Sequence, residues 1–156
     1  FINGIGFGLD GYCCQRGDEK KEKGKKVDYT MIAIFGLLFK YKPRNGRVLV
    51  DGKEYRLNKI TIAPSMHGRF YGGGMMPTPD QDRFSGKLSF MALHDSGRIR
   101  TLSIFPSIFK GEHVKNQDVV TILEGREITV EFDTPCALQI DGETIRDVKS
   151  YTVKAF

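Results

Sequence analysis

The chain has 156 residues, 40% of them hydrophobic, with a formal net charge of +5 and a pI of about 9.1. This length and composition fit one domain with a single apolar core and exclude a disordered chain. The basic excess favours an anionic partner, but the 11 Phe and 6 Tyr residues are scattered rather than interleaved with Arg, which argues against dedicated nucleic-acid binding.

The first motif is GFGLDG, residues 6 to 11, which has the letters G-x-G-x-x-G of a phosphate-binding loop. That fingerprint requires a strand before it and the N-terminus of a helix after it. Only five residues precede Gly6, and a lysine-rich segment soon follows. We therefore do not interpret the motif as a nucleotide-binding loop.

The next two segments differ in polarity. GDEKKEKGKKVD, residues 17 to 28, has mixed charge and predicts a solvated loop; the alternative is a patch that contacts lipid head groups. Asp28 is a plausible N-cap for a helix of about four turns over residues 29 to 42, which ends before Pro43. This helix is apolar almost all round but shorter than the roughly 20 residues that span a bilayer. We expect it in a buried position or at a protein interface.

Strand patterns dominate the rest of the chain. RVLV and KEYRL flank Asp51-Gly52 and predict a tight hairpin, KITIA follows, and KLSFMAL continues the sheet after the glycine-rich stretch. Residues 98 to 111 predict a short helix broken near Pro106 and closed by Gly111. EITVEFD and CALQID alternate strictly, and SYTVKAF ends the chain. The predicted fold is mainly β (α+β), a β-sandwich with one long buried helix and one short broken helix.

Two stretches are candidate sites. FYGGGM, residues 70 to 75, places an aromatic pair before Gly72, Gly73 and Gly74, whose open backbone could form a ligand wall with Tyr71. The alternative is a wide bulge where the chain crosses another strand. In QIDGETI, residues 139 to 145, Asp141 and Glu143 flank a glycine, which indicates a hairpin turn. Two carboxylates at this spacing could also accept a proton from a hydroxyl or hold Mg²⁺.

The order of GFGLDG, an apolar helix, FYGGGM followed by prolines, a helix ending in KGEH and finally IDGE resembles the C-terminal half of the diacylglycerol kinase catalytic family, which includes bacterial lipid kinases and sphingosine kinases. The resemblance covers nearly the whole chain. It implies a cytoplasmic two-domain kinase, peripheral at an anionic inner membrane face. Residues 1 to 156 would be its lipid-side domain. ATP would be held mainly by an N-terminal domain with a Gly-Gly-Asp-Gly-Thr loop, which we expect to precede Phe1 in a longer protein.

The resemblance also implies roles for the two candidate stretches. Glu143, with Asp141, would be the base toward a diacylglycerol-like hydroxyl that attacks the γ-phosphate of ATP, and Mg²⁺ would neutralise the phosphates. Tyr71 and Gly72 to Gly74 would shape the lipid side. The isolated chain is expected to be inactive, because a base without a phosphate cradle can neither position nor neutralise the phosphoryl group.

The sequence departs from the family pattern at two places. His67-Gly68 stands where the family has Asn-Gly, and Phe84-Ser85-Gly86 stands where it has Asp-Asp-Gly. The family's acid there belongs to a magnesium-linked network. Ser85 carries no charge, and Asp80 or Asp82 would replace the acid only if the loop were re-registered. We therefore assign no metal ligand.

Two further hypotheses follow. The chain could be a non-catalytic lipid-binding or regulatory module of the same fold, having lost the acid at Ser85. It could also belong to a kinase for a soluble substrate such as a nucleotide, although it has no aromatic-plus-acid ribose pattern. The cysteine and histidine residues show no spacing typical of a metal site or a disulfide framework, and the cysteines suit a reducing cytoplasm. These residues are Cys13, Cys14, Cys136, His67, His94 and His113.

Overall fold

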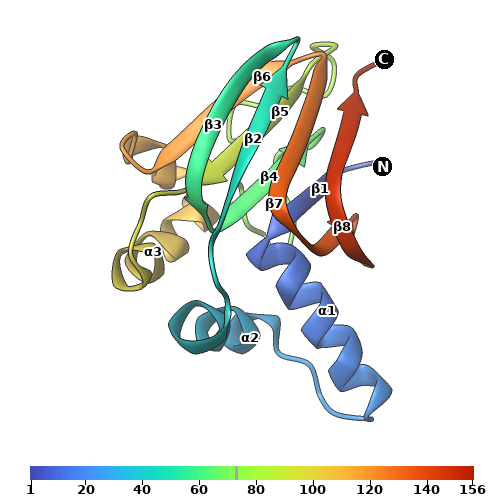
Figure 1. The fold of residues 1–156 in the computed structure, drawn as a ribbon, viewed down its shortest axis with the longest axis vertical. Helices are drawn as coiled ribbons and strands as arrows, with labels where there is room; N and C mark the ends of the chain where they lie inside the picture. Colours follow the sequence, from blue (N-terminus) through green and yellow to red (C-terminus); the bar gives the residue numbers. More distant parts are fainter. Residues whose placement is uncertain (73) are drawn as a thin grey trace.

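A curled antiparallel sheet forms most of the molecule, and the helices gather at one end of it (Figure 1). The computed structural model describes residues 1–72 and 74–156, apart from the side chains of Thr30, Leu37 and Leu38. The strand order is β3-β2-β7-β1-β4-β5-β6, and β8 pairs with β7. The strands are β1 (Gly4–Gly8), β2 (Arg44–Val50), β3 (Lys53–Ile60), β4 (Ile62–Met66), β5 (Leu88–Leu93), β6 (Val120–Gly125), β7 (Glu127–Ile140) and β8 (Glu143–Lys154).

The long strand β7 joins the two halves of the sheet. Its first half pairs with β2, from Ile128 to Phe132, whereas its last residues pair with β1. The ladder with β8 shifts register between Glu131 and Cys136, a stretch that includes Pro135, which has no N–H to donate. This irregularity allows one strand to turn from one half of the curled sheet to the other.

An apolar core fills the space that the curled sheet encloses. Phe7, Phe90 and Phe132 are each 0% exposed, and the rings of Phe7 and Phe132 lie 4.8 Å apart between centroids. Tyr151 also packs on Phe7, and its hydroxyl is 2.8 Å from Oγ of Ser65. The alternating strands of the sequence therefore direct one face into a common core, as a β-sandwich requires.

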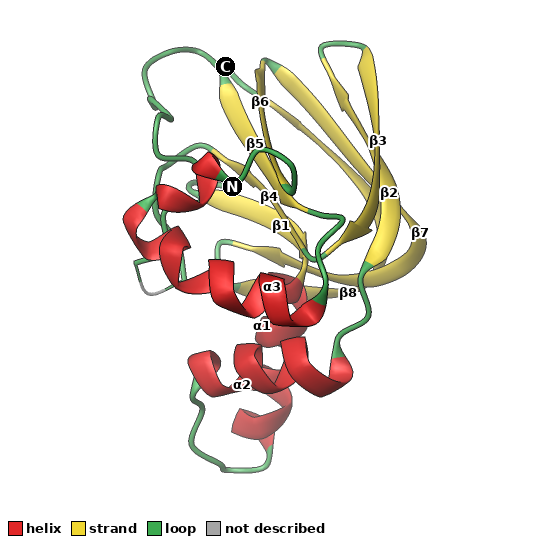
Figure 2. Cartoon of the chain, turned by 90° about the vertical axis from the view of Figure 1, so that its left-hand side faces the viewer, coloured by secondary structure: helices red, strands yellow, loops and turns green. Residues whose placement is uncertain are grey.

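The helices pack on one end of the sheet and on one another (Figure 2). A second apolar cluster, which includes Leu9, Met91, Leu93 and Ile108, lies between them and the sheet. None of the helices among the described residues has the length and hydropathy needed to cross a bilayer. The helices are α1 (Leu9–Glu22), α2 (Tyr29–Phe35), the π-helix η1 (Gly36–Lys40), α3 (Arg98–Ile104) and the 3₁₀ helices η2 (Phe105–Lys110) and η3 (Glu112–Lys115).

The structure confirms the predicted fold class and several local signals. The Asp51-Gly52 hairpin joins β2 and β3, and the broken helix changes from α3 to η2 at Phe105 and ends at Gly111, whose φ is 70°. Asp28 caps α2, since its carboxylate accepts a hydrogen bond from the N–H of Met31 at 3.2 Å. These signals are local, so the sequence was sufficient to predict them.

Two predictions need correction, and two strands were missed. Residues 17 to 22 are not a loop but the C-terminal part of α1, in which Lys and Glu are good helix formers and Arg16 pairs with Glu19 at 2.9 Å. The helix predicted over 29 to 42 is α2 followed by η1, and it is only partly buried, with Phe35 53% exposed. Strands β1 and β6 were not predicted.

The reason for rejecting a nucleotide loop at GFGLDG was also partly wrong. Strand β1 contains the first two glycines, and α1 begins at Leu9 directly after it. The strand is antiparallel to both of its neighbours, β4 and β7, so the motif does not lie in the parallel βαβ unit that the dinucleotide fingerprint requires.

Candidate functional site

A cavity of about 1060 Å³ lies between the helices and the adjoining end of the sheet. Its walls come from α1, the loop before α2, α2 itself, β4, the segment at Tyr71, η2 and the β7–β8 turn. Most of the wall is apolar, and this volume is in the range of small-molecule binding sites. The apolar and thiol side chains of the wall include Leu9, Cys13, Cys14, Val27, Tyr29, Ala33, Ile62, Met75, Phe105 and Phe109.

Asp10 gives this cavity a carboxylate. Both oxygens of Asp10 are buried, and neither has a hydrogen-bond partner of normal geometry among the described residues. Burial raises the pKa of this carboxyl from 3.8 to about 7, and weaker interactions with its own backbone N–H and with Gln139 offset only part of the effect. Burying an acceptor without a donor lowers the stability of the fold, so a ligand that donates a hydrogen bond to this carboxylate would bind favourably.

The β1–α1 junction fixes the position of Asp10. A Cβ at Gly6 would collide with the Asp10 carboxylate, one at Gly8 with the carbonyl oxygen of Thr61, and one at Gly11 with that of Ala137. The φ of Gly8 is also +96°, a value that favours glycine. The glycines of GFGLDG therefore allow α1 to start close against Thr61 and β7, with the Asp10 carboxylate over Gly6 of β1.

Gln139 lines the cavity beside Asp10. Its Nε2 also lacks a hydrogen-bond partner among the described residues, while its Oε1 accepts from the N–H of Gly142 at 3.0 Å. At this end of the cavity, an acceptor and a donor thus both lack a partner of normal hydrogen-bond geometry among the described residues. A ligand hydroxyl could bind both, donating to Asp10 and accepting from Gln139.

The thiols and the phenol around Asp10 are in their protonated forms at neutral pH. Burial raises the pKa of Cys13 to about 12 and that of Cys14 to about 11, with Asp10 adding to both effects. Burial likewise raises the pKa of Tyr71 well above its usual value. Since the thiolate is the nucleophilic form, these cysteines line the wall as apolar groups rather than nucleophiles.

Asp141 lies on the cavity wall, but its carboxylate already has partners. It accepts hydrogen bonds from the N–H groups of Ile2 at 2.5 Å and of Asn3 and Gly4 at 2.8 Å each. Burial acts to raise the pKa of Asp141, but these three bonds outweigh it, so the pKa is below its ordinary value. The carboxylate therefore fastens the N-terminal segment to the β7–β8 turn.

Glu143 begins β8 just after this turn, is exposed, and lies outside the cavity wall formed by the described residues. The two candidate stretches therefore meet only in part. The structure brings Tyr71, Gly72, Asp141 and Gly142 to one cavity and places Glu143 beside it.

The predicted glycine wall is a tight turn at the cavity. Tyr71 pairs with Met75, and the N–H of Tyr71 donates to the carbonyl of Met75 at 2.9 Å. Gly72 has φ +54° and Gly74 has φ +108°, so both occupy the left-handed region. Tyr71 and Gly72 line the cavity, whereas Gly73 lies outside the described residues.

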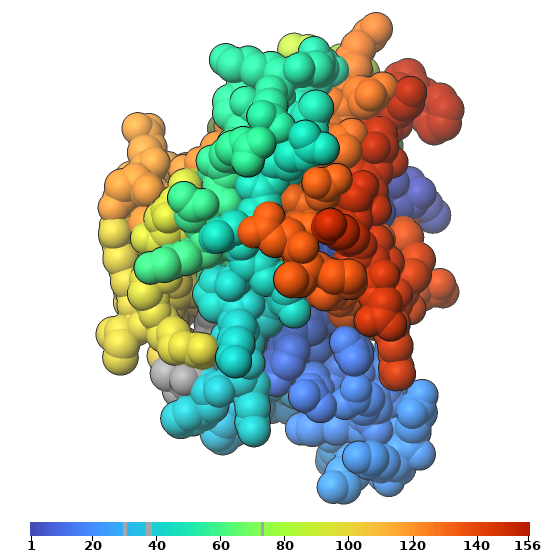
Figure 3. Space-filling model, in the orientation of Figure 1, coloured from blue at the N-terminus to red at the C-terminus, as the bar shows by residue number. Residues whose placement is uncertain are grey.

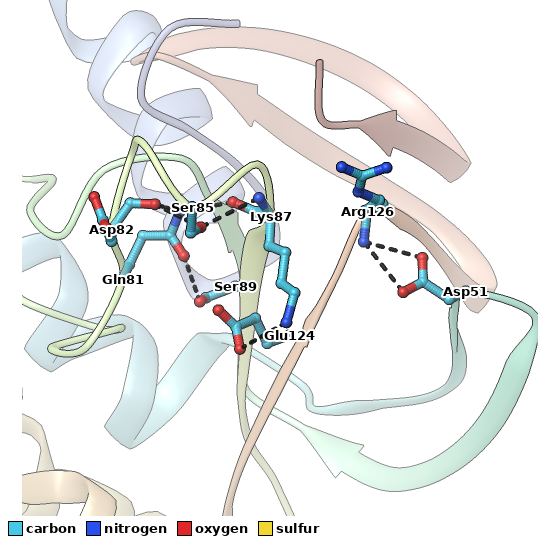
Figure 4. Close-up of polar contacts among 8 residues, drawn as sticks. All are labelled: Asp51, Gln81, Asp82, Ser85, Lys87, Ser89, Glu124 and Arg126. Carbon is cyan, nitrogen blue, oxygen red and sulfur yellow. Dashed lines mark hydrogen bonds and ion pairs between the residues drawn. The ribbon is translucent and has the colours of Figure 1, made fainter.

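Local hydrogen bonds hold the loop at Ser85 (Figure 4). Oγ of Ser85 donates to the carbonyl of Asp82 at 2.8 Å and accepts from the N–H of Lys87 at 3.2 Å. The carboxylate of Asp82 accepts from the N–H of Phe84 at 2.9 Å. Asp82 is thus used within its own turn, and Asp80 is exposed.

The strand end beyond this loop is also braced by local contacts (Figure 4). Lys87 pairs with Glu124 across β5 and β6 at 3.9 Å, and Oγ of Ser89 donates to Gln81 at 2.6 Å. Within the part of the chain that the structure describes, no group of three or more His, Cys, Asp or Glu side chains could hold a metal ion.

Sequence reasoning missed Asp10 as a candidate site residue. The signal was present, because GFGLDG contains an acid directly after a glycine-rich strand. The glycines of this motif suggest phosphate binding, whereas the burial of the carboxylate depends on the packing of α1 against β7, which lies far along the chain.

Comparison with known proteins agrees with this fold. The family described as "YegS C-terminal NAD kinase beta sandwich-like domain" matches residues 3–153, and the chain belongs to this family. Diacylglycerol kinases of Mycobacterium tuberculosis strains CDC 1551 and H37Rv are 30% identical over 128 residues, which is 82% of this chain. The chain spans 40% of the length of these curated relatives.

A solved diacylglycerol kinase structure from Bacillus anthracis str. Sterne superposes with a TM-score of 0.61 at 18% identity, covering 99% of this chain and 50% of its own. At 18% identity, this structural similarity supports the fold of the chain and says nothing of its activity.

Proposed function

Because the chain belongs to the YegS-type C-terminal β-sandwich family, we propose that it is the lipid-side domain of a two-domain ATP-dependent kinase. The reaction would transfer the γ-phosphate of ATP to the hydroxyl of a diacylglycerol-like lipid. The two curated relatives carry the name diacylglycerol kinase and extend well beyond the matched region, which leaves room for a nucleotide-holding domain.

The observation that carries this proposal is the cavity with Asp10 at its polar end. A diacylglycerol has one hydroxyl donor and long apolar chains. Its hydroxyl would donate to the unpartnered Asp10 carboxylate, and its chains would follow the wall formed by Leu9, Phe105 and Phe109. A soluble nucleotide would leave most of this apolar wall without a partner, which favours the lipid.

The chain's own residues would bind and orient the hydroxyl. A carboxyl with a pKa of about 7 can accept a proton at neutral pH, so Asp10 joins Glu143 as a candidate base. Asp141 would act as a positioning residue, since it holds Ile2 to Gly4 against the turn that carries Glu143. The opposite face of the cleft, with the phosphate cradle, would come from an N-terminal domain.

ATP and Mg²⁺ would neutralise and align the transferred phosphoryl group in the complete enzyme. The described residues of this chain do not fit a magnesium site by themselves, because Ser85 is uncharged and Asp82 is used in its own turn. We therefore assign ATP and Mg²⁺ to the complete kinase, which would be cytoplasmic and peripheral at the inner membrane face.

The decisive test uses the full-length protein with ATP, Mg²⁺ and diacylglycerol in mixed micelles. We expect phosphatidic acid to form, with Asp10→Asn and Glu143→Gln each lowering kcat/KM at least 100-fold and the exposed Asp80→Asn having little effect. Equal rates for the wild type and Glu143→Gln would remove Glu143 from the mechanism. No product with any long-chain alcohol would refute the kinase proposal.

Binding to the 156-residue chain separates the role of Asp10 from catalysis. Dioctanoylglycerol should bind more tightly than its O-methyl ether, which cannot donate a hydrogen bond, and Asp10→Asn should narrow this difference. Equal binding of the two compounds by the wild-type chain would contradict the assigned role of Asp10.

A second candidate function is a lipid-binding or regulatory module that does not catalyse phosphoryl transfer. The observation that favours it is the uncharged Ser85, held in its own hydrogen-bonded turn. Dioctanoylglycerol binding without product formation by the full-length protein would select this function over the kinase.

A further inference from the structure

The side chain of Gln81 is at the centre of the loop that leads into β5. Gln81 is 2% exposed. Its Nε2 donates to the backbone carbonyls of Lys87 at 3.0 Å, His67 at 3.2 Å and Asp82 at 3.3 Å. Its Oε1 accepts from Oγ of Ser89 at 2.6 Å (Figure 4). Three carbonyl oxygens therefore converge on one buried nitrogen.

These neighbours fix the orientation of the Gln81 amide. If the amide were turned over, its oxygen would face three carbonyl oxygens, none of which can donate a hydrogen bond. The nitrogen must therefore face the carbonyls. An NH₂ group has only two hydrogens, so the three carbonyls share them. The negative ends of three carbonyl dipoles thus surround one small donor.

Convergent carbonyl oxygens are also ligands of hard cations. Ca²⁺ binds backbone carbonyls together with carboxylates, and Mg²⁺ in proteins is usually held through one or two carboxylates. The family pattern has an acid at the position of Ser85, but this chain has an uncharged hydroxyl there. The carboxylate of Asp82 accepts from the N–H of Phe84 at 2.9 Å. The carbonyls of a cation site are therefore present without a carboxylate to complete it, and the Gln81 amide fills the point where they meet.

Further hydrogen bonds hold the same loop without an ion. We call residues 78–87 the Gln81 loop. The N–H of Gln81 donates to the carbonyl of Thr78 at 3.1 Å, and Nε of Arg69 donates to the carbonyl of Gln81 at 2.7 Å. Oγ of Ser85 donates to the carbonyl of Asp82 at 2.8 Å. The backbone of the loop thus finds its partners within the protein.

The Gln81 loop is joined to the strands and to the cavity. His67 directly follows β4 and Ser89 lies in β5, so the amide of Gln81 ties the loop to both strands. Nη2 of Arg83 donates to Oδ1 of Asn3 at 3.1 Å, and Asn3 lines the cavity. In the space-filling view β2, β3, β7 and β8 form most of the face toward the viewer, and the loop lies mostly behind them (Figure 3). A change in the loop would reach the cavity wall through Asn3.

We propose that the Gln81 amide takes the place of a divalent cation, so that the Gln81 loop keeps its conformation without a metal ion. The amide gives two hydrogens to the convergent carbonyls, and as a neutral group it needs no carboxylate to balance it. The departure from the family pattern at Ser85 then has a physical reason, because an acid there would have no cation to bind. The Mg²⁺ of the proposed kinase would serve the phosphates of ATP and not this loop.

Urea unfolding of the wild-type chain in EDTA, MgCl₂ or CaCl₂ is the first test. A divalent salt at about 10 mM would saturate even a millimolar site, and KCl of equal ionic strength controls for screening. The unfolding midpoint should be the same in all four solutions. Hydrogen exchange at the N–H groups of Phe84, Ser85 and Lys87 should also be unchanged. Slower exchange of these groups with either cation would overturn the proposal.

Gln81→Glu is the second test, because it changes the chemistry of the occupant and keeps its shape. At about pH 8 the side chain is a carboxylate, which would face the three carbonyls with an oxygen and no donor. The midpoint in EDTA should fall by about 1 M urea. Mg²⁺ or Ca²⁺ should recover most of this loss, since a cation can bridge a carboxylate and carbonyls. Gln81→Met, which has a similar length but no charge, should lose stability without any recovery.

Two further variants complete the design. Gln117→Glu adds the same charge at an exposed position outside the loop, and should keep the wild-type midpoint with and without cations. Ser85→Asp restores an acid where the family has one. With Gln81 in place, it should still show no stabilisation by Mg²⁺, and this measurement does not depend on whether Gln81→Glu folds.

Three results with these variants would overturn the proposal: Gln81→Glu as stable as the wild type in EDTA, an equal loss for Gln81→Glu with and without cations, or stabilisation of Ser85→Asp by Mg²⁺. All the measurements concern folding and metal binding and need neither ATP nor a lipid. An inactive full-length protein would therefore refute the kinase and leave this inference standing.

Discussion

Replacing Asp10 by Asn is expected to stabilise the protein above neutral pH. Asn has nearly the same shape but no charge, so it removes the cost of ionising a buried carboxyl. The two oxygens of Asp10 are buried without a hydrogen-bond partner among the described residues, and burial is the main reason for the raised pKa. A residue that weakens the fold in this way is typical of a binding site.

The size and sign follow from the pKa. A rise from 3.8 to about 7 in the folded state corresponds to about 4 kcal/mol, since each pKa unit is about 1.4 kcal/mol. The unfolded chain releases the Asp10 proton near its ordinary pKa, whereas the folded chain keeps it until about pH 7. The contribution of Asp10 to the free energy of unfolding should therefore fall as pH rises from about 4 to about 7. Below and above this range, Asp10 should add no further dependence on pH.

Urea unfolding at several pH values between about 4 and 8.5 measures this effect. The wild type and Asp10→Asn should have similar stability at the acid end, and the variant should be more stable by up to about 4 kcal/mol at the alkaline end. Asp80→Asn, at an exposed position, should show no such divergence. A stability difference that stays constant with pH, or a variant that is less stable at pH 8.5, would refute the assignment of a buried, unsatisfied carboxyl.

Other predictions concern the framework of the cavity. Asp141→Asn should lower the free energy of unfolding by about 1–3 kcal/mol at pH 7, because it weakens three charge-assisted hydrogen bonds. Since the pKa of Asp141 is lowered in the folded state, the stability difference between the variant and the wild type should shrink as pH falls through that pKa. Faster hydrogen exchange at Ile2–Gly4 in the variant is a second measurement of the same loss. Gly8→Ala should lower the free energy of unfolding in urea by about 2–4 kcal/mol, because Gly8 has φ +96° and a Cβ there collides with the carbonyl of Thr61. Gly24→Ala is the control: Gly24 has φ +69° but open space around it, so this substitution should lower the stability less. Tyr151→Phe should lower the free energy of unfolding by about 1–2 kcal/mol, because it removes the buried hydrogen bond to Ser65. An unchanged midpoint of urea unfolding would contradict this and show that Ser65 finds another partner.

The parts of the fold that the sequence predicts correctly depend on neighbours along the chain. The Asp51-Gly52 hairpin, the Asp28 cap and the stop at Gly111 each involve residues a few positions apart. Strand β1 was missed because GIGFG has three glycines and no alternation of polar and apolar residues. Its strand conformation comes from β4 and β7, which lie far along the chain.

The same distinction explains the candidate site. The turn at Asp141-Gly142 was predictable, but its role as an anchor for the N-terminus depends on donors more than 130 positions away. The helix over residues 29 to 42 was expected to be buried or at an interface because its sequence is apolar almost all round. Tertiary packing buries Ile32 and Ala33 and leaves Phe35 and Phe39 exposed, a difference that the hydrophobic pattern alone does not predict.

The glycines of GFGLDG match a phosphate-binding motif but have a different role in this fold. In a phosphate-binding loop, glycines let a ligand approach the backbone closely. Here the same residue type lets the protein's own groups approach: the Asp10 carboxylate over Gly6, the Thr61 carbonyl at Gly8, and the Ala137 carbonyl at Gly11. These contacts place α1 so close to Thr61 and β7 that the Asp10 carboxylate loses water without gaining a donor of normal hydrogen-bond geometry among the described residues. The glycines therefore create the hydrogen-bonding need that a ligand hydroxyl would meet, although they do not contact that ligand themselves.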